Sequence, residues 1–216
     1  MKTIIVTAIT ALAIGTSACG GSSSSSTGSA TVSGTAGGLS IASVADARSI
    51  YSPSANCGGN NGNPGVTFIA VSLSNKPNSC DIVTTHKEVP NETDLTLTIL
   101  QTWVGSNNGP TPTTNPVLAA GTYTIGSTTT DANGFSTHVG AALNYVDATC
   151  STAGAKALNA TAGTITLTSA SATGVKGTYS VTISGSTISG SFDTVACGFT
   201  FDQFCAAVGA TTTCGT

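Results

Sequence analysis

The stretch GTITLTSASATGVKGTYSVTISGSTISGSF, residues 163–192, alternates apolar and small polar side chains along most of its length. A period of two residues is typical of strands that bury one face and expose the other. The Ser-Gly-Ser sequence at 184–186 is a turn signal between two of these segments. The stretch therefore predicts a meander of three strands, whose inward positions include Ile165, Leu167, Tyr179, Val181, Ile183, Ile188, Gly190 and Phe192.

The same alternation occurs upstream, where it predicts further strands at residues 66–73, 95–100, 123–125 and 139–146. Helical signals are confined to residues 79–87 and 201–208, and the longest loop is expected at 105–120. We expect residues 31–216 to form a single all-β domain, an antiparallel β-sandwich or β-barrel of about eight strands with one or two short helices.

The composition is poor in charge. Only 7% of the residues are charged, against roughly 25% in ordinary globular proteins. Nine acidic and six basic residues give a net charge of −3. The sequence has no basic patch, which argues against nucleic acid as a partner. It also has no polybasic segment that would bind an anionic membrane surface.

The N-terminus has the features of an export signal. Lys2 is followed by an apolar segment at residues 4–14, which is too short to cross a hydrocarbon core of about 30 Å as a helix. The sequence Thr16-Ser17-Ala18-Cys19 resembles the lipobox of bacterial lipoproteins. That resemblance implies a signal peptide at 1–18, cleavage after Ala18 and lipidation of Cys19. The alternative is an ordinary secretory signal.

A Ser/Gly-rich segment follows the lipidation candidate, so that residues 19–30 form the anchor and its tether. Such a composition behaves as a flexible coil, with a reach of roughly 20 Å. Several acyl chains on Cys19 would hold the protein at a membrane, which is the partner that the lipobox implies. Residue 20 is Gly and not the Asp of inner-membrane retention, so the resemblance favours the outer membrane.

The chain contains seven cysteines. Lipidation of Cys19 leaves an even number for disulfides, which persist in an oxidising compartment. The spacings do not fit a zinc site. The six remaining cysteines allow fifteen connectivities. We favour a local clasp Cys205–Cys214, a bond Cys150–Cys197 between the ends of two β-segments, and Cys57–Cys80 as the pair that is left.

Two histidines are the candidates for acid–base chemistry. His86 precedes Glu88, Glu92 and Asp94, which would suit a metal or hydrolytic site. The competing interpretation is a solvated polar stretch that leaves a helical turn. His138 lies in a predicted strand, where a histidine with ordinary strand contacts is expected. The sequence has no nucleophile elbow, phosphate-binding loop or His-Glu-x-x-His motif.

A short acidic turn is a candidate for calcium. Asp131-x-Asn133-Gly134 offers oxygen ligands but lacks the downstream acid of an EF-hand. An Asn-Gly β-turn explains the same residues without a metal.

A glycan platform is the remaining candidate site. β-Sandwiches often present aromatic side chains to sugars, and Trp103 would supply the first ring. It equally well caps the core at the end of its strand. Its partners on such a platform would be Tyr51, Tyr123 or Tyr145.

The order of these features resembles a loose group of uncharacterised envelope lipoproteins of deltaproteobacteria such as myxobacteria. The resemblance rests on the lipobox, the tether and the β patterns at 31–38, 121–125, 147–150, 163–168, 175–183 and 188–197. It implies an all-β fold in the cell envelope, and it brings no activity and no catalytic residues.

The sequence therefore favours a non-enzymatic envelope lipoprotein that needs no cofactor and acts as a structural or binding module with a protein or glycan ligand. An envelope hydrolase using His86, Glu88 and Glu92, or a carbohydrate-binding module, is the alternative.

Overall fold

The structure is a computed structural model, and it describes residues 27–55, 66–103, 117–151, 153–198, 203 and 213–215. At positions 54, 55 and 103 it describes the backbone alone. The predicted signal peptide and most of the tether lie outside these residues, as do Cys19, Cys57 and Cys205. Most of the loop at 105–120 also lies outside them, as does the predicted helix at 201–208 except for Gln203, which is helical.

The described residues are mostly strands, which confirms the all-β prediction. They form one short helix, α1 (Asp81–Thr85), and the strands β1 (Ser29–Ser33), β2 (Asp46–Ala55), β3 (Val66–Ser74), β4 (Lys87–Glu88), β5 (Thr93–Trp103), β6 (Gly121–Thr124), β7 (Thr128–Thr130), β8 (Phe135–Tyr145), β9 (Lys156–Ser171), β10 (Gly174–Ile183), β11 (Ser186–Asp193), β12 (Val195–Ala196) and β13 (Thr213–Cys214).

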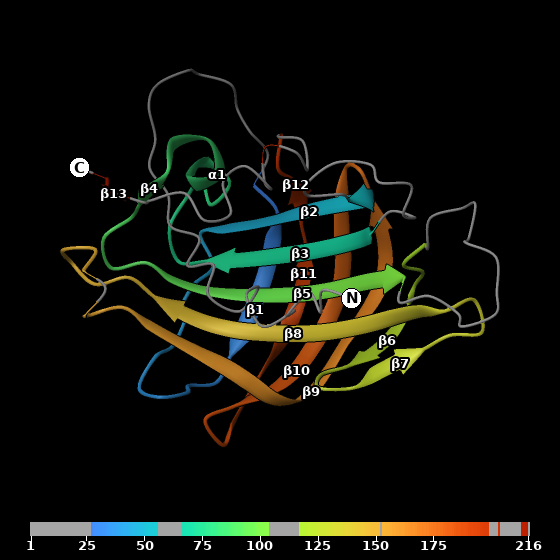
Figure 1. Cartoon of the computed structure of the whole chain (residues 1–216). Coiled ribbons are helices and arrows are strands. Elements are labelled where there is room, and N and C mark those ends of the chain that lie inside the picture. Colours follow the sequence, from blue (N-terminus) through green and yellow to red (C-terminus); the bar gives the residue numbers. More distant parts are fainter. Residues whose placement is uncertain are drawn as a thin grey trace.

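One strongly curled sheet makes up the body (Figure 1). Its hydrogen-bonded order is β1-β11-β10-β9-β8-β5-β3-β2-β12, with β6 added to β9 and β7 added to β8. The predicted meander is confirmed as β9-β10-β11, all antiparallel. Ser184 and Gly185 have φ of 50° and 76° at its second turn. Two successive residues with positive φ suit a tight hairpin, because this backbone matches the twist of the strands.

Strand β9 connects the two halves of the sheet. The front half consists of β2, β3, β5 and β8, and the back half consists of β1, β11, β10, most of β9 and β6 (Figure 1). Its first residues, 156–159, pair with β8, whereas residues from 160 onward pair with β10. On the opposite side, β12 follows β11 after Thr194 alone and pairs in parallel with β2. The Thr194 hydroxyl is buried and lies 2.8 Å from both Ser49 Oγ and Val175 O. It therefore joins strands of both halves.

The core fills the space between the two halves. The residues at alternate positions of β3, β5, β9 and β10 point inward and are buried, as the period-two pattern predicts. Burial of each such aliphatic side chain stabilises the fold by about 1.5–3 kcal/mol. The largest apolar side chains that are almost completely buried are Ile69, Leu73, Leu95, Leu97, Ile99, Leu143, Ile165, Leu167, Ile183 and Ile188.

Helix α1 covers part of the outer face of the front half. Its Ile82 and Val83 are buried in a second apolar cluster with Ile50, Phe68 and Ala70 from β2 and β3. The helix predicted at 79–87 is shorter in the structure, because His86 adopts a left-handed conformation with φ of 54° and ends it. Its amide still donates to Ile82 O, 2.8 Å away.

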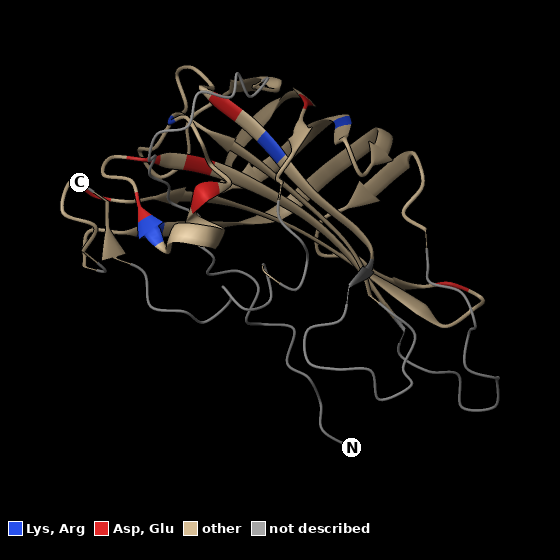
Figure 2. Cartoon of the chain, turned by 90° about the horizontal axis from the view of Figure 1, so that it is seen from above, with Lys and Arg blue, Asp and Glu red and all other residues tan. Residues whose placement is uncertain are grey.

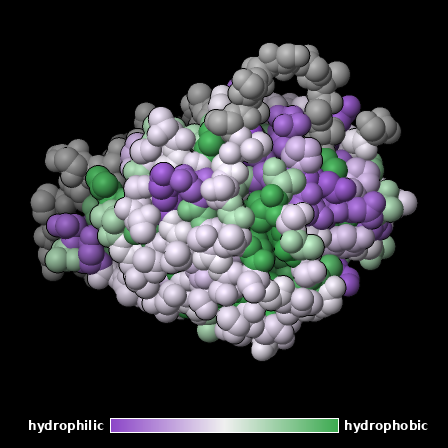
Figure 3. All heavy atoms as spheres, turned by 180° about the vertical axis from the view of Figure 1, so that it is seen from behind, coloured by the Kyte–Doolittle hydropathy of each residue, from purple (hydrophilic) through white to green (hydrophobic). Residues whose placement is uncertain are grey.

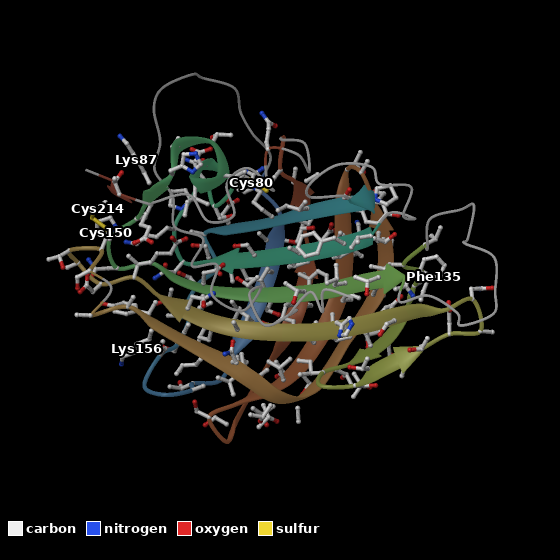
Figure 4. The ribbon with its side chains drawn as sticks, in the orientation of Figure 1. Cys80, Lys87, Phe135, Cys150, Lys156 and Cys214 are labelled. Carbon is white, nitrogen blue, oxygen red and sulfur yellow. A yellow bond between two sulfur atoms is a disulfide. The ribbon has the colours of Figure 1, made fainter. Side chains whose placement is uncertain are left out.

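Within the described residues, two disulfides join Cys80 to Cys197 and Cys150 to Cys214 (Figure 4). All three predicted pairings are therefore wrong. Cys80 lies next to α1, which covers β2, and Cys197 follows β12, which pairs with β2. Cys214 lies in β13, which pairs with β4. The pairing thus follows the order of strands in space and not the order of cysteines along the chain.

Replacing Cys80 and Cys197 together by serine should lower the free energy of unfolding by about 2–5 kcal/mol. The bond joins cysteines 117 positions apart in the sequence. Without it the unfolded chain can adopt many more conformations, so unfolding becomes more favourable. Urea unfolding of the variant and the wild type measures the change.

The double variant Cys150→Ser/Cys214→Ser is the matched control, and it should leave α1 in place. Hydrogen exchange at the His86 amide, which α1 protects, should therefore accelerate only when the Cys80–Cys197 bond is lost. Equal exchange rates in both double variants would contradict the claim that the Cys80–Cys197 bond holds α1 in place.

Candidate functional site

The outer face of the front half carries a row of polar side chains across four strands. The pairing register places Asp46 opposite Ser74, Ser74 opposite Asp94, and Asp94 opposite Asn144. All four side chains are buried. Glu92 precedes β5 and is buried beside this row. We call Asp46, Glu92 and Asp94 the acid cluster. Charged residues are few overall, and most gather at the end of the molecule that carries α1 (Figure 2).

Asp94 is surrounded by donors. Ser72 Oγ donates to Oδ1 at 2.5 Å, and Thr96 Oγ1 donates to Oδ2 at 2.6 Å. Asn144 Nδ2 donates to Oδ2 at 3.4 Å. Burial raises the pKa of Asp94 to about 6, although the hydrogen bonds from Ser72, Thr96 and Asn144 lower it. These donors stabilise the carboxylate within the sheet, so their geometry holds Asp94 in place.

Glu92 has fewer partners. Ser74 Oγ donates to Oε1 at 2.5 Å, and Oε2 has no hydrogen-bond partner in the described part of the chain. Burial, followed by the nearby Asp94 carboxylate, raises the pKa of Glu92 to about 8. The Glu92 side chain therefore carries a proton at neutral pH, since a second buried negative charge beside Asp94 is unfavourable.

Asp46 connects the sheet to the segment before α1. Its Oδ1 accepts from Arg48 Nε at 2.8 Å, and both side chains are buried. Its Oδ2 accepts from the backbone N and the Oγ of Ser79, at 2.8 and 3.0 Å. Every one of these contacts lies within the protein, so Asp46 positions the segment that leads to α1.

The structure does not assemble the hydrolytic site proposed for His86, Glu88 and Glu92. The backbone O of His86 accepts from Thr213, and the backbone O of Glu88 accepts from Gly215. No hydrogen bond or ion pair between His86 and either acid is found among the described residues. The expectation of a solvated stretch is also wrong for Glu92 and Asp94, which are both 1% exposed.

His138 lies on β8 opposite Leu100, on the same outer face. Its Nε2 is 3.4 Å from Ser136 Oγ. This is a contact along its own strand, and among the residues with a described position no acid is hydrogen-bonded to His138.

The turn at Asp131 has a structural explanation. Asp131 Oδ1 accepts from the backbone N of Asn133 at 2.9 Å and of Phe135 at 3.0 Å. Gly134 has φ of 82°. The carboxylate therefore holds the turn between β7 and β8, as the β-turn interpretation predicts. In the part of the chain that the structure describes, no group of three or more His, Cys, Asp or Glu is arranged to hold a metal ion.

The tyrosines of the predicted glycan platform do not form a common exposed surface. Tyr51, Tyr123 and Tyr145 are half-buried and each packs against the core. The Tyr123 hydroxyl donates to Ala119 O at 2.7 Å. The side chain of Trp103 lies outside the described residues.

Comparison with known proteins gives no match. No family model fits the chain, and neither the curated proteins nor the solved structures contain a significant relative. None of the described helices has the length and apolar character needed to span a membrane.

The sequence pattern does not reveal the serine donors to Asp94 and Glu92. Ser72 and Ser74 stand at alternate positions of β3, opposite the side that carries Val71 and Leu73. Polar residues at the non-core positions of a strand normally indicate a solvated face. Their burial depends on the segments that cover this face, which the local pattern does not encode.

Substituting Glu92 by glutamine should flatten the dependence of stability on pH. The folded-state pKa of about 8 lies above the ordinary value of 4.5. Stability contributed by the protonated group is therefore complete below about pH 4.5 and is lost as the pH rises toward 8. The loss is on the order of a few kcal/mol in the wild type, and the neutral amide of Glu92→Gln avoids it.

Unfolding free energies measured between pH 7 and 8 isolate this effect, because Asp94, whose pKa is about 6, is mainly ionised above pH 7. Asp193→Asn is the matched control, because this exposed carboxylate is not among the charges that act on Glu92, and its stability should follow the wild-type pH dependence. An unchanged pH dependence in Glu92→Gln would show that Glu92 is already ionised in the folded state.

Proposed function

We propose that this chain is an exported lipoprotein of the cell envelope, in which a lipid on Cys19 anchors a non-enzymatic β domain that serves as a binding or structural module. The observation that carries the proposal is the pair of disulfides, Cys80–Cys197 and Cys150–Cys214. Disulfides persist where the surroundings are oxidising. That setting agrees with the export signal at residues 1–18 and the tether at 19–30.

The arrangement of the acid cluster supports a non-enzymatic role. The carboxylates of Asp46 and Asp94 accept hydrogen bonds from neighbouring side chains, and both are buried. A catalytic acid or base must reach its substrate directly or through one water. These two groups hold the β-sheet and the segment before α1 together instead.

For the architecture, we infer a flattened barrel. The β8–β9 pairing links the two halves on one side, and the β12–β2 pairing links them on the other. β12 continues β11 covalently after Thr194, so the chain itself returns from β11 to the edge of β2. Ala196 N also donates to Thr173 O, between β9 and β10, at 3.0 Å. The short β12 thus covers the edge of β2, which protects a tethered protein from edge-to-edge association there.

The membrane partner in this proposal is reached through Cys19 alone. Gly20 at the following position agrees with an outer-membrane destination. The Ser/Gly-rich tether separates the lipid from β1, which begins at Ser29.

Replacing Cys19 by serine should release the protein from membranes. Each buried CH₂ of an acyl chain contributes about 0.8 kcal/mol to membrane binding, so loss of the lipid removes the anchor. Fractionation of cells grown with radiolabelled palmitate should find the wild type labelled and in the membrane pellet. The variant should be unlabelled and in the soluble fraction.

The double variant Cys150→Ser/Cys214→Ser serves as control, because it removes cysteines and keeps residue 19. It should stay labelled and sediment with membranes. A Cys19→Ser protein that still sediments with membranes, or a wild type that takes up no label, would refute the lipid anchor.

A further inference from the structure

The back half of the sheet presents ordered rows of hydroxyl side chains to solvent. The register aligns one row from β1 to β6 across five strands, Thr31, Ser191, Thr178, Thr166 and Thr122. A second row is Ser33, Ser189, Ser180, Thr164 and Thr124. All of these side chains are exposed or half-exposed. We call these two rows the hydroxyl face.

Seen from behind, the molecule has a broad surface of near-neutral hydropathy, as expected for serine and threonine (Figure 3). Among the described residues the one large hydrophobic side chain that is exposed is Val117, which belongs to neither row. The hydroxyl face therefore offers hydrogen bonds in place of apolar contacts.

One ion pair borders the hydroxyl face. Lys176 on β10 stands opposite Asp193 on β11, and Lys176 Nζ lies 2.7 Å from Asp193 Oδ2. The two side chains are 57% and 51% exposed. Because the charges are paired, this part of the surface has no net attraction for a polyanion. It does place ammonium donors next to carboxylate acceptors.

A shallow groove of about 360 Å³ runs beside this ion pair. Its lining includes Ser29, Thr31, Thr168, Ser191, Lys176 and Asp193. The β9–β10 register shifts between Lys176 and Gly177, which leaves Thr168 as the extra residue of a bulge. A bulge changes the direction in which the neighbouring side chains point. Here the bulge lies at the groove and interrupts the regular array.

From this geometry we propose that the groove beside Lys176 and Asp193 binds a neutral glycan. The proposal rests on the proposed function, in which the domain acts as a binding module outside the cytoplasm. Each exposed hydroxyl of this surface forms hydrogen bonds to water. A ligand that covers the surface must form new hydrogen bonds in their place, because unpaired buried polar groups are costly. A ligand dense in hydroxyls can do so.

Sugar rings meet this requirement better than a protein partner does. A protein interface forms about one hydrogen bond per 100–200 Å², which would leave most of the rows unpaired. A vicinal diol, by contrast, can accept from the Lys176 ammonium and donate to the Asp193 carboxylate at the same time. Serine and threonine also lose little side-chain entropy when a ligand orders them.

The test is a glycan microarray carrying neutral and anionic glycans, probed with the full chain purified in a detergent that contains no sugar. Printed glycans and clustered protein together give a multivalent readout that suits weak single sites. The wild type should bind neutral glycans. The double variant Lys176→Met/Asp193→Asn keeps side-chain size and should lose at least about tenfold of the signal, since two charge-assisted hydrogen-bonding groups are removed.

The double variant Lys156→Met/Thr129→Val is the matched control. It changes an exposed lysine and an exposed threonine that do not line the groove, and it should bind like the wild type. Binding to no neutral glycan, binding to anionic glycans alone, or neutral binding that survives Lys176→Met/Asp193→Asn would each overturn the proposal. The lipid anchor is judged by palmitate labelling, so failure here leaves the membrane assignment intact.

Discussion

A single hydrogen-bonded sheet supplies both walls of the hydrophobic core, and the rest of the structure depends on that constraint. Each strand must send alternate side chains inward, because the two halves of the sheet face one another across the core. β9 meets the constraint by pairing with β8 at its start and with β10 afterwards. Thr194 meets it on the other side, where one buried hydroxyl reaches both β2 and β10.

The outer positions are free of that constraint, and the two halves use them differently. On the front half, hydroxyls of Ser72, Ser74 and Thr96 donate to the Asp94 and Glu92 side chains and are buried with them. On the back half, the rows through Thr178 and Ser180 face solvent. The same residue types thus act as internal donors where segments cover them, and as a hydration surface where nothing in the described chain does.

Local patterns predicted what depends on neighbours along the chain. The alternation at 163–192 predicted the meander, and the turn at Asp131 was predicted as a β-turn from its Asn-Gly sequence. The disulfides could not be predicted, because Cys80 meets Cys197 only after β12 pairs with β2 across the whole fold. The prediction that the acidic stretch is solvated was wrong for a related reason. Glu92 and Asp94 occupy a polar sequence that is typical of solvated surfaces, and their burial comes from covering segments that the local pattern does not specify.

The distribution of hydrogen-bonding capacity separates structural from functional candidates in this molecule. The donors around Asp94 and Asp46 are directed at carboxylates within the fold, so a ligand there would have to displace contacts that position α1 and β5. The hydroxyls beside Lys176 and Asp193 keep most of their capacity directed at solvent, although Thr31 and Ser191 also contact one another. Binding at that surface exchanges water for ligand and disturbs no contact of the core. Recognition is therefore expected on the back half of the sheet, and the front half supplies the rigidity that holds it.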